Sequence, residues 1–373
     1  MIVIGGGPAG ATVAGELAGR GVSVLLLEKA AYPRPKCCGG GLTVRAAGLL
    51  GGCVGEVAEN TITTLRLSRR GAGARALDLG QPLMYTLSRE SFDQLLAERA
   101  QQAGARILCG TPVTGVAETG DGVEVVTAAG VWRGRFAVGA DGARSVVAKA
   151  VGGAGGDYLM ALSAEVVPAD RVLDEWRSRV ALDLGSLSRG YGWLFPKAGR
   201  LSIGVGGPAR QARRLRDAHH RLVHALGIGD HTVTRWSAAP IPVCRGEAVV
   251  SRGRLALVGD AAALADPFTG EGIYNAIVSG RLAARAIISA LENKLSNLGE
   301  YQRLVDAEIM PEMAAANRFA RLLGTVPGQL FGVADRDGRV QRAGAALLRG
   351  ETTYASLWDR FVSLGGLYSF LLR

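Results

Sequence analysis

Three glycines and an acid near the beginning of the sequence have the types and spacing to bind a dinucleotide. Gly5, Gly7 and Gly10 follow G-x-G-x-x-G spacing directly after a short apolar stretch, and Glu28 comes after the next apolar stretch. The first glycine of such a turn allows tight bending, the second lets a pyrophosphate approach the backbone, and the third lets helix and strand pack closely. Glu28 is placed to accept hydrogen bonds from ribose hydroxyls. The pattern predicts dinucleotide binding; a glycine-rich loop without a ligand is the alternative.

A second candidate site lies in residues 29–42, which contain two prolines and three consecutive glycines. Prolines and glycines together disfavour regular structure, so this stretch is predicted to be a loop. Glycines without a Cβ let backbone amides reach a flat ring or a phosphate, and Lys36 adds a positive charge. We expect the thiol of Cys38 to face the reactive ring or the substrate; a small buried hydrophobic role is the alternative.

Two acids and two glycines later in the chain are suited to sugar hydroxyls and anions. Asp141 and Asp260 each follow a predicted buried strand, where a carboxylate can reach a ribose or the phosphate region. Gly270 and Gly272 precede a predicted helix, whose free N-terminal amides favour an anion. These positions predict a second anion or oxyanion site in the same chain.

Aromatic residues define a candidate substrate wall. Tyr191, Trp193 and Phe195 occur at every second position, so in a strand they share one face. Only 6% of the residues are aromatic, which makes a substrate-cavity wall the favoured interpretation, and ordinary sheet packing the alternative.

The elements that must position these residues form an α/β pattern in some stretches of the chain and a mainly antiparallel sheet pattern in others. The strand at 2–4, the helix from 11 and the strand at 22–27 predict a Rossmann-type α/β unit. Ser88–Ala103 is a predicted helix opened by Arg89, whose side chain is either a solvated charge or a phosphate or ribose contact. The other expected elements are strands in 60–87, a strand at 106–109, a hairpin in 113–126 around 119–122, sheet in 157–208, a basic helix at 209–226, a buried strand at 254–258 and helices in 297–373.

Composition limits the class of protein. The chain has 373 residues, enough for two joined domains, and a formal net charge of +10. The charge reflects either base composition or attraction to an anionic substrate, partner or membrane surface. Basic residues do not interleave with aromatics as in nucleic-acid sites, and neither a metal site nor a disulfide framework is expected from 4 His and 5 scattered Cys. No signal peptide and no membrane-spanning stretch is recognised, which predicts a cytoplasmic protein, with peripheral contact at the inner membrane face left open.

Three fingerprints occur in the order seen in flavoproteins that resemble p-hydroxybenzoate hydroxylase: Gly5-x-Gly7-x-x-Gly10, Ala140-Asp141-Gly142 and Gly259-Asp260. Within that group, Lys36 to Leu42 is similar to the K-x-C-G-G-G-L loop of the geranylgeranyl reductase family. Tyr191 to Pro196 resembles that family's Y-x-W-x-F-P motif, and Arg349 to Tyr354 resembles a segment near its C-terminus.

The resemblance implies a glutathione reductase-like Rossmann FAD domain, an inserted mainly antiparallel β-sheet substrate domain and a helical C-terminus. The expected boundaries are 1–59, 88–152 and 246–290 for the discontinuous FAD-binding domain, 60–87 and 153–245 for the substrate domain, and 291–373 for the C-terminal helical region. Position in the motifs implies FAD contacts from Ala9, Glu28, Cys38, Gly39, Gly41, Arg89, Val113, Asp260, Gly272 and Ile273. The full predicted cofactor site adds Gly5, Gly7, Gly10, Lys29, Lys36, Asp141 and Gly270.

The implied reaction is reduction of carbon–carbon double bonds in a hydrophobic isoprenoid or lipid substrate. Tyr191, Trp193 and Phe195 would wall a long apolar pocket, reduced flavin would deliver hydride from N5, and Cys38 would relay the proton. With a single G-x-G-x-x-G, the electron donor is either transiently bound NAD(P)H or a ferredoxin-like protein, and an acidic donor protein would suit the basic surface.

Other functions share this fold. The main alternative is an FAD-dependent monooxygenase that hydroxylates a small or aromatic natural-product-like molecule, which would need a polar pocket. A halogenase would need a lysine that this chain does not have between Lys36 and Lys149. A non-enzymatic electron-transfer or binding flavoprotein is disfavoured by the Gly270-x-Gly272 motif beside the expected flavin.

Overall fold

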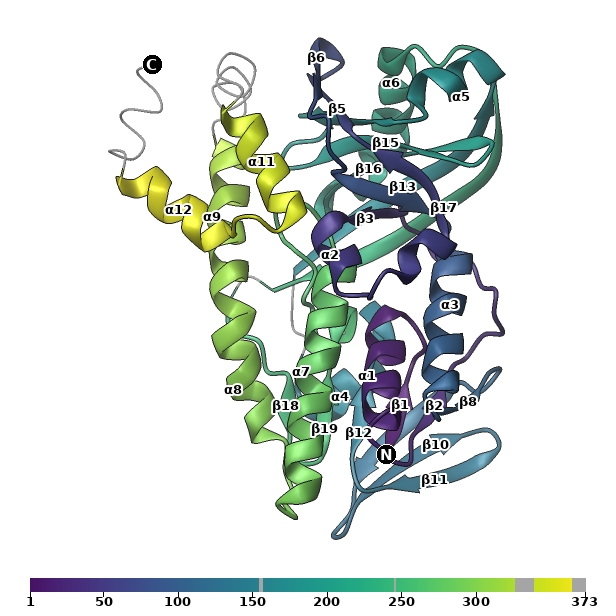
Figure 1. Cartoon of the computed structure of the whole chain (residues 1–373), viewed down its shortest axis with the longest axis vertical. Helices are drawn as coiled ribbons and strands as arrows, with labels where there is room; N and C mark the ends of the chain where they lie inside the picture. Colours follow the sequence, from purple (N-terminus) through teal and green to yellow (C-terminus); the bar gives the residue numbers. More distant parts are fainter. Residues whose placement is uncertain (154–156, 245, 326–338, 364–373) are drawn as a thin grey trace. The chain divides into compact units, whose positions relative to one another are not determined.

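The computed structural model describes residues 1–153, 157–244, 246–325 and 339–363 (Figure 1). The chain divides into two compact units, each assembled from three separate stretches. Unit 1 comprises Met1–Pro35, Arg89–Asp157 and Ile241–Ala314. Unit 2 comprises Lys36–Ser88, Tyr158–Pro240 and Ala315–Arg373.

Unit 1 is built on a six-stranded sheet whose strands are short and buried. Its order is β18 (Ser251–Arg252), β19 (Leu255–Leu257), β12 (Ala137–Gly139), β1 (Ile2–Ile4), β2 (Leu25–Leu27) and β8 (Arg106–Leu108). All neighbours pair in parallel except β18 and β19. Continuous apolar runs such as Ile2–Ile4 fit this arrangement, because parallel strands are covered on both faces.

Helices cover the sheet of unit 1, and small residues let them approach it. The helix α1 (Pro8–Ala18) contacts both α7 (Ile273–Glu292) and α3 (Arg89–Gln102), as Figure 1 shows. Smaller helices complete the unit: η2 (Gly142–Arg144), α4 (Val146–Val151), η4 (Gly259–Ala262) and α8 (Gly299–Glu308). A second sheet of unit 1 is formed by β9 (Val113–Glu118), β10 (Val123–Thr127) and β11 (Gly130–Gly134).

Unit 2 contains a seven-stranded, mainly antiparallel sheet. Its order is β17 (His231–Val243), β13 (Asp157–Pro168), β16 (Arg200–Pro208), β15 (Tyr191–Lys197), β14 (Arg179–Leu184), β5 (Thr64–Arg69) and β6 (Ala72–Asp78). The pair of β14 and β5 is parallel. A three-stranded sheet joins β3 (Gly41–Thr43), β7 (Met84–Leu87) and β4 (Ala58–Ile62).

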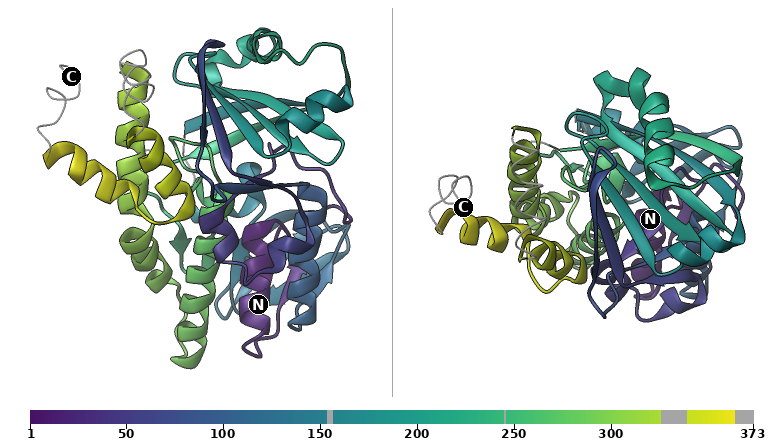
Figure 2. Two further views of the ribbon diagram at one scale, coloured as in Figure 1. Left: turned by 45° about the horizontal axis from the view of Figure 1, so that its top comes forward. Right: turned by 90° about the horizontal axis from the view of Figure 1, so that it is seen from above.

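The two faces of the large sheet differ in chemistry. Leu194 pairs with Ile203, and both are fully buried in a cluster that includes Leu222 of α6 (Leu215–Leu226). Figure 2 shows α6 across one face of this sheet. Since side chains alternate along a strand, Tyr191 and Trp193 lie on the opposite face. The sheet therefore presents an apolar core face and a separate aromatic face.

The remaining helices of unit 2 are short or belong to the C-terminal region: α2 (Val44–Gly48), η1 (Cys53–Glu56), α5 (Asp170–Trp176), η3 (Ala209–Arg214), α9 (Met310–Thr325), which begins in unit 1, α11 (Arg339–Arg349) and α12 (Tyr354–Ser363). The rings of Phe319 and Trp358 meet edge to face at 5.2 Å, which ties α9 to α12. Of the predicted helical region at 291–373, residues 326–338 and 364–373 lie outside the described part.

Most predicted elements are confirmed, including the strands in 60–87, the helix after Ser88 and the hairpin around 119–122. The prediction of one α-helix over 209–226 is wrong for its first six residues. Ala209–Arg214 forms a 3-10 helix, and the α-helix begins at Leu215. The physical reason is that this arginine-rich segment offers no large apolar side chain for burial before Leu215.

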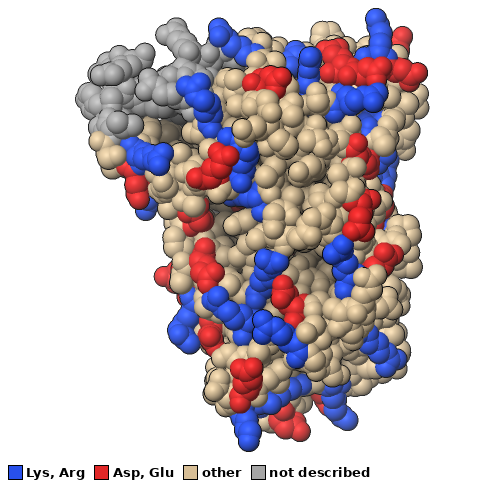
Figure 3. Space-filling view, in the orientation of Figure 1, with Lys and Arg blue, Asp and Glu red and all other residues tan. Residues whose placement is uncertain are grey.

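Surface charge and hydropathy add two constraints. On the face shown in Figure 3, basic side chains are interspersed with acidic ones. The net charge of +10 is therefore not gathered into one patch on that face. Among the described residues, every helix is too short or too polar to cross a bilayer.

Candidate functional site

The three glycines of the turn after β1 differ in the space around them: Gly5 and Gly10 are crowded by backbone, and Gly7 faces open space. A Cβ on Gly5, whose φ is +98°, would lie 2.3 Å from the carbonyl oxygen of Ala140, and a Cβ on Gly10 would lie 1.9 Å from that of Gly5. These backbone atoms cannot move aside, so both positions require glycine. A Cβ on Gly7 would meet only Arg34 Nη2, at 3.8 Å. Gly7 is the N-cap of α1, so the open space lies where a phosphate can approach a helix N-terminus.

Glu28 is fixed beside this turn. Its side chain follows β2 and is 4% exposed. Oε2 accepts a hydrogen bond from the Gly6 amide at 2.7 Å, Oε1 accepts one from the Ala30 amide at 3.1 Å, and Arg34 lies 3.4 Å from Oε2. An ionised carboxylate has about four lone-pair sites, so Glu28 keeps capacity to accept ribose hydroxyls in the position predicted from sequence.

Arg89 is buried, and the interpretation of its side chain as a solvated charge is wrong. It is 8% exposed, and its Nε and Nη2 donate to the two oxygens of Asp93 at 2.8 and 3.0 Å. Arg34 contacts the same carboxylate at 3.3 Å. Bidentate geometry of this kind fixes a guanidinium tightly. The predicted contact of Arg89 with phosphate or ribose stays a prediction.

The carboxyl ends of three parallel strands meet at one edge. Ile4, Gly139 and Leu257 lie in register on β1, β12 and β19. The glycine turn, Asp141 and Asp260 therefore emerge side by side, although they are far apart in sequence. In open parallel sheets this edge is where ligands bind.

Two features of that edge fit a cofactor with hydroxyl and phosphate groups. Oδ2 of Asp141 accepts the Val146 amide at 2.7 Å, whereas its buried Oδ1 has no hydrogen-bond partner among the described residues. Gly272 is the N-cap of α7, and a Cβ there would lie 3.4 Å from Oδ1 of Asp260. Gly270 has a φ of +71° in the preceding turn. The residues present thus fit a dinucleotide cofactor at this edge of unit 1.

The other predicted cofactor residues of unit 1 differ in exposure. Ala9 and Ile273 are buried at the N-terminal turns of α1 and α7, Val113 is half-buried at the start of β9, and Lys29 is exposed. Their predicted contacts with FAD stay predictions.

Unit 2 brings the predicted loop and the predicted aromatic strand into contact. A Cβ on Gly39 would lie 2.7 Å from Phe195 Cδ2 and 2.8 Å from Trp193 Nε1. A Cβ on Gly41 would lie 3.0 Å from Phe195 Cε2. The glycine-rich loop therefore lies directly on the aromatic face, with the rings of Tyr191 and Trp193 centred 6.0 Å apart. A residue larger than glycine at position 39 would collide with the aromatic side chains, and at position 41 it would crowd Phe195.

The two adjacent thiols of the loop have different surroundings. Cys37 Sγ lies 3.8 Å from Ser163 Oγ, and burial raises the pKa of the Cys37 thiol. Cys38 Sγ instead accepts a hydrogen bond from the Gly40 amide at 3.4 Å. Lys36, half-buried, precedes both. Burial keeps Cys37 protonated, and Cys38 is the thiol held by the glycine turn.

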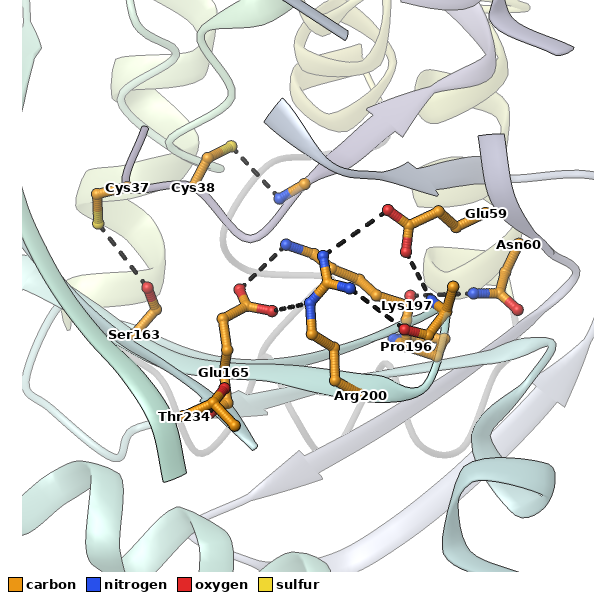
Figure 4. A network of polar contacts seen from close by, with 12 residues as sticks. Cys37, Cys38, Glu59, Asn60, Ser163, Glu165, Pro196, Lys197, Arg200 and Thr234 are labelled. Carbon is orange, nitrogen blue, oxygen red and sulfur yellow. Dashed lines mark hydrogen bonds and ion pairs between the residues drawn. The ribbon is translucent and has the colours of Figure 1, made fainter. Parts of the chain in front are cut away.

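Sequence reasoning missed an ion-pair network next to this loop, with Lys197 and Glu165 buried and Arg200 partly exposed. Lys197 and Arg200 both contact Glu165, and Arg200 also lies near Glu59 (Figure 4). A signal for Lys197 was present, because it stands two residues after Phe195 and shares its face. Glu165 carried no such signal, since it belongs to a strand 32 residues away in sequence.

A separate pocket of about 480 Å³ lies on the α6 side of unit 2 and is lined by His219, His220, His224 and His231 together with Trp236. Burial lowers the pKa of His219 to about 4, despite its hydrogen bond with the Ile203 carbonyl at 3.1 Å. Within the ranges that the structure describes, no cluster of three or more His, Cys, Asp or Glu side chains is arranged to hold a metal ion.

Comparison with known proteins identifies the relatives of this chain. The family described as FAD binding domain matches residues 1–303. Geranylgeranyl diphosphate reductase from Rhodobacter capsulatus is 32% identical over 306 residues, covering 78% of this chain and 75% of that protein. Menaquinone reductase from Mycolicibacterium smegmatis is 30% identical over 353 residues, covering 88% and 85%. The crystal structure of a geranylgeranyl bacteriochlorophyll reductase-like protein from Thermoplasma acidophilum aligns with a TM-score of 0.76 and 25% identity over 87% of each chain.

Proposed function

Because this chain belongs to the geranylgeranyl reductase family of FAD-dependent oxidoreductases, we propose that it reduces carbon–carbon double bonds of an isoprenoid chain. The observation that carries the proposal is the contact of the Gly39–Gly41 backbone with the aromatic face of β15. An apolar, aromatic wall beside a cofactor loop suits a hydrocarbon chain better than a charged or strongly polar substrate.

Unit 1 holds the cofactor in this proposal. The α1 N-terminus at Gly7 takes the pyrophosphate, Glu28 takes the ribose, and Asp141 Oδ1 gains the hydrogen-bond partner that it lacks. Asp260 and the α7 N-terminus at Gly272 take further polar groups of the cofactor. Once reduced, bound FAD supplies a hydride.

The residues of unit 2 handle the substrate. Tyr191, Trp193 and Phe195 hold the isoprenoid chain and exclude water from it. Addition of a hydride to one alkene carbon requires a proton on the other, and Cys38 is the proposed donor because its thiol lies in the loop that contacts this wall. Solvent then returns the proton to the thiol.

The electron donor is proposed to be NAD(P)H or a ferredoxin-like protein, each bound transiently. The relatives include enzymes named for a prenyl diphosphate and for menaquinone, and both molecules carry an isoprenoid chain. A substrate of this kind partitions into membranes, so we also propose that the protein meets the membrane peripherally.

An anaerobic single turnover tests the proposal. The protein, reduced by one equivalent of dithionite, is mixed with geranylgeranyl diphosphate, and flavin absorbance is followed while the product is analysed by mass spectrometry. Flavin reoxidation with a product two hydrogens heavier supports the proposal. Reoxidation that requires oxygen, with a hydroxylated aromatic product, would instead identify the alternative monooxygenase.

A further inference from the structure

Lys197, the last residue of β15, forms a buried ion pair with Glu165, which Figure 4 shows. Lys197 Nζ donates to Glu165 Oε1 at 3.1 Å, with side-chain exposures of 3% and 7%. Arg200 Nε donates to the other carboxylate oxygen at 2.9 Å, so both oxygens of Glu165 are fixed. Removing two charges from water is expensive and is repaid only by good geometry. The ammonium group of Lys197 is therefore held in one place.

The Lys197 side chain reaches the glycine-rich loop at Gly40. A Cβ on Gly40 would lie 2.9 Å from Lys197 Cε and 3.2 Å from its Nζ. The end of the side chain thus covers the Cα of Gly40, whose φ is +80°. The Gly40 carbonyl also accepts the Leu87 amide at 2.9 Å, and the Leu87 carbonyl oxygen lies 2.2 Å from the same Cβ position. Gly40 is consequently in close contact with both β7 and Lys197.

Gly40 in turn holds the thiol of Cys38. Its amide donates to Cys38 Sγ at 3.4 Å, so the direction of this amide sets where the sulfur lies. The contacts form a chain from Glu165 through Lys197 and Gly40 to the thiol. Cys37, although adjacent in sequence, is held by Ser163 on β13 instead.

We infer that Lys197, fixed by Glu165, is a positioning residue that orients the Cys38 thiol for proton donation through its contact with Gly40. The inference rests on the proposed function for its purpose, and on the contacts above for its geometry. A methionine of similar length at 197 would keep the apolar packing but lose the bond to Glu165. Glu165 would still be paired with Arg200, so the substitution leaves no buried charge without a partner.

Alkylation of the thiols by iodoacetamide tests the inference without any turnover. The holoprotein is treated for short times, and modification of each cysteine is measured by peptide mass spectrometry. Cys109, which is exposed, and Cys53, which is buried, provide internal fast and slow references. In Lys197→Met, alkylation of Cys38 relative to Cys109 should rise about fivefold or more. Lys197→Arg, which retains a cation for Glu165, should restore most of the original rate.

The exposed Lys149 supplies a matched control, because Lys149→Met removes the same charge elsewhere. It should leave the ratio of Cys38 to Cys109 unchanged. An unchanged ratio in folded Lys197→Met protein would overturn the inference. If Lys197→Met does not fold, Lys197→Gln keeps a donor for Glu165 but lacks the Cε contact, and it is judged by the same ratio.

Single-turnover kinetics separates the inference from the proposed function. Lys197→Met should bind FAD as the wild type does. With geranylgeranyl diphosphate, its rate of flavin reoxidation should be about tenfold lower, because the transition state of the chemical step is less well stabilised. A wild-type protein that reduces no isoprenoid would refute the proposed function, while the alkylation ratio would still decide whether Lys197 orients the thiol.

Discussion

Two glycines of the first turn should respond to the same substitution in opposite ways. At Gly10 an added Cβ would lie 1.9 Å from the Gly5 carbonyl oxygen and 3.0 Å from the Ala140 methyl group, and the Gly5 backbone cannot move aside. Overpacking of this kind costs about 1–3 kcal/mol. At Gly7 the nearest atom to a Cβ is 3.8 Å away, and its φ of −77° and ψ of −174° suit alanine. Gly7→Ala should therefore change the stability of the apoprotein by less than about 1 kcal/mol, because the gain from the unfolded state is offset by the weaker capping of alanine at this N-cap.

Binding of FAD, in contrast, should be weakened by Gly7→Ala. The new methyl group of Gly7→Ala stands where a pyrophosphate would approach the α1 amides. Loss of one charge-assisted hydrogen bond costs about 1.5–3 kcal/mol, which weakens FAD binding roughly 10- to 100-fold. Urea unfolding of the apoprotein measures the first effect, and titration with FAD by fluorescence quenching measures the second. Wild-type FAD affinity in Gly7→Ala, or wild-type apoprotein stability in Gly10→Ala, would refute this assignment of the turn.

Three further predictions follow from single side chains. Burial lowers the pKa of His219 to about 4, whereas the value in the unfolded chain is near 6.5, so the unfolded chain binds one more proton between these pH values. From pH 6.5 to 4, the free energy of unfolding of the wild type should therefore fall by up to about 3 kcal/mol more than that of His219→Gln. Equal pH profiles of the two proteins in urea unfolding would contradict this. Phe195→Ala should raise the KM for an isoprenoid about tenfold or more while FAD content stays constant; an unchanged KM would remove Phe195 from the substrate wall. Tyr301, fully buried, donates to the Leu257 carbonyl at 2.7 Å; Tyr301→Phe should cost about 1–3 kcal/mol in unfolding free energy, and no loss would show that the carbonyl finds another partner.

The local parts of the site were predictable from sequence, because their physics is local. The roles of Gly5, Gly7 and Gly10 depend on a turn of a few residues between a strand and a helix. The shared face of Tyr191, Trp193 and Phe195 follows from strand periodicity alone. The glycine spacing and the alternation of aromatic residues can both be recognised without knowledge of the rest of the chain.

The parts that were missed depend on distant strands. Glu165 and Lys197 lie on β13 and β15, which are separated by β16 in the sheet, so their contact depends on a register that the sequence does not display. The same limit applies to Cys37 and Cys38, which are equivalent as neighbours until Ser163 and Gly40 distinguish them. Arg89 and Asp93 are four residues apart in a helix, and their pairing was accessible, but their burial was not.

The most direct test of the central claim is mass spectrometry of the lipid that co-purifies with the yellow protein, before and after anaerobic reduction by dithionite. A reductase of isoprenoid double bonds should carry a bound isoprenoid that gains mass in steps of two hydrogens once the flavin is reduced. A small aromatic ligand that gains oxygen only after air is readmitted would contradict it.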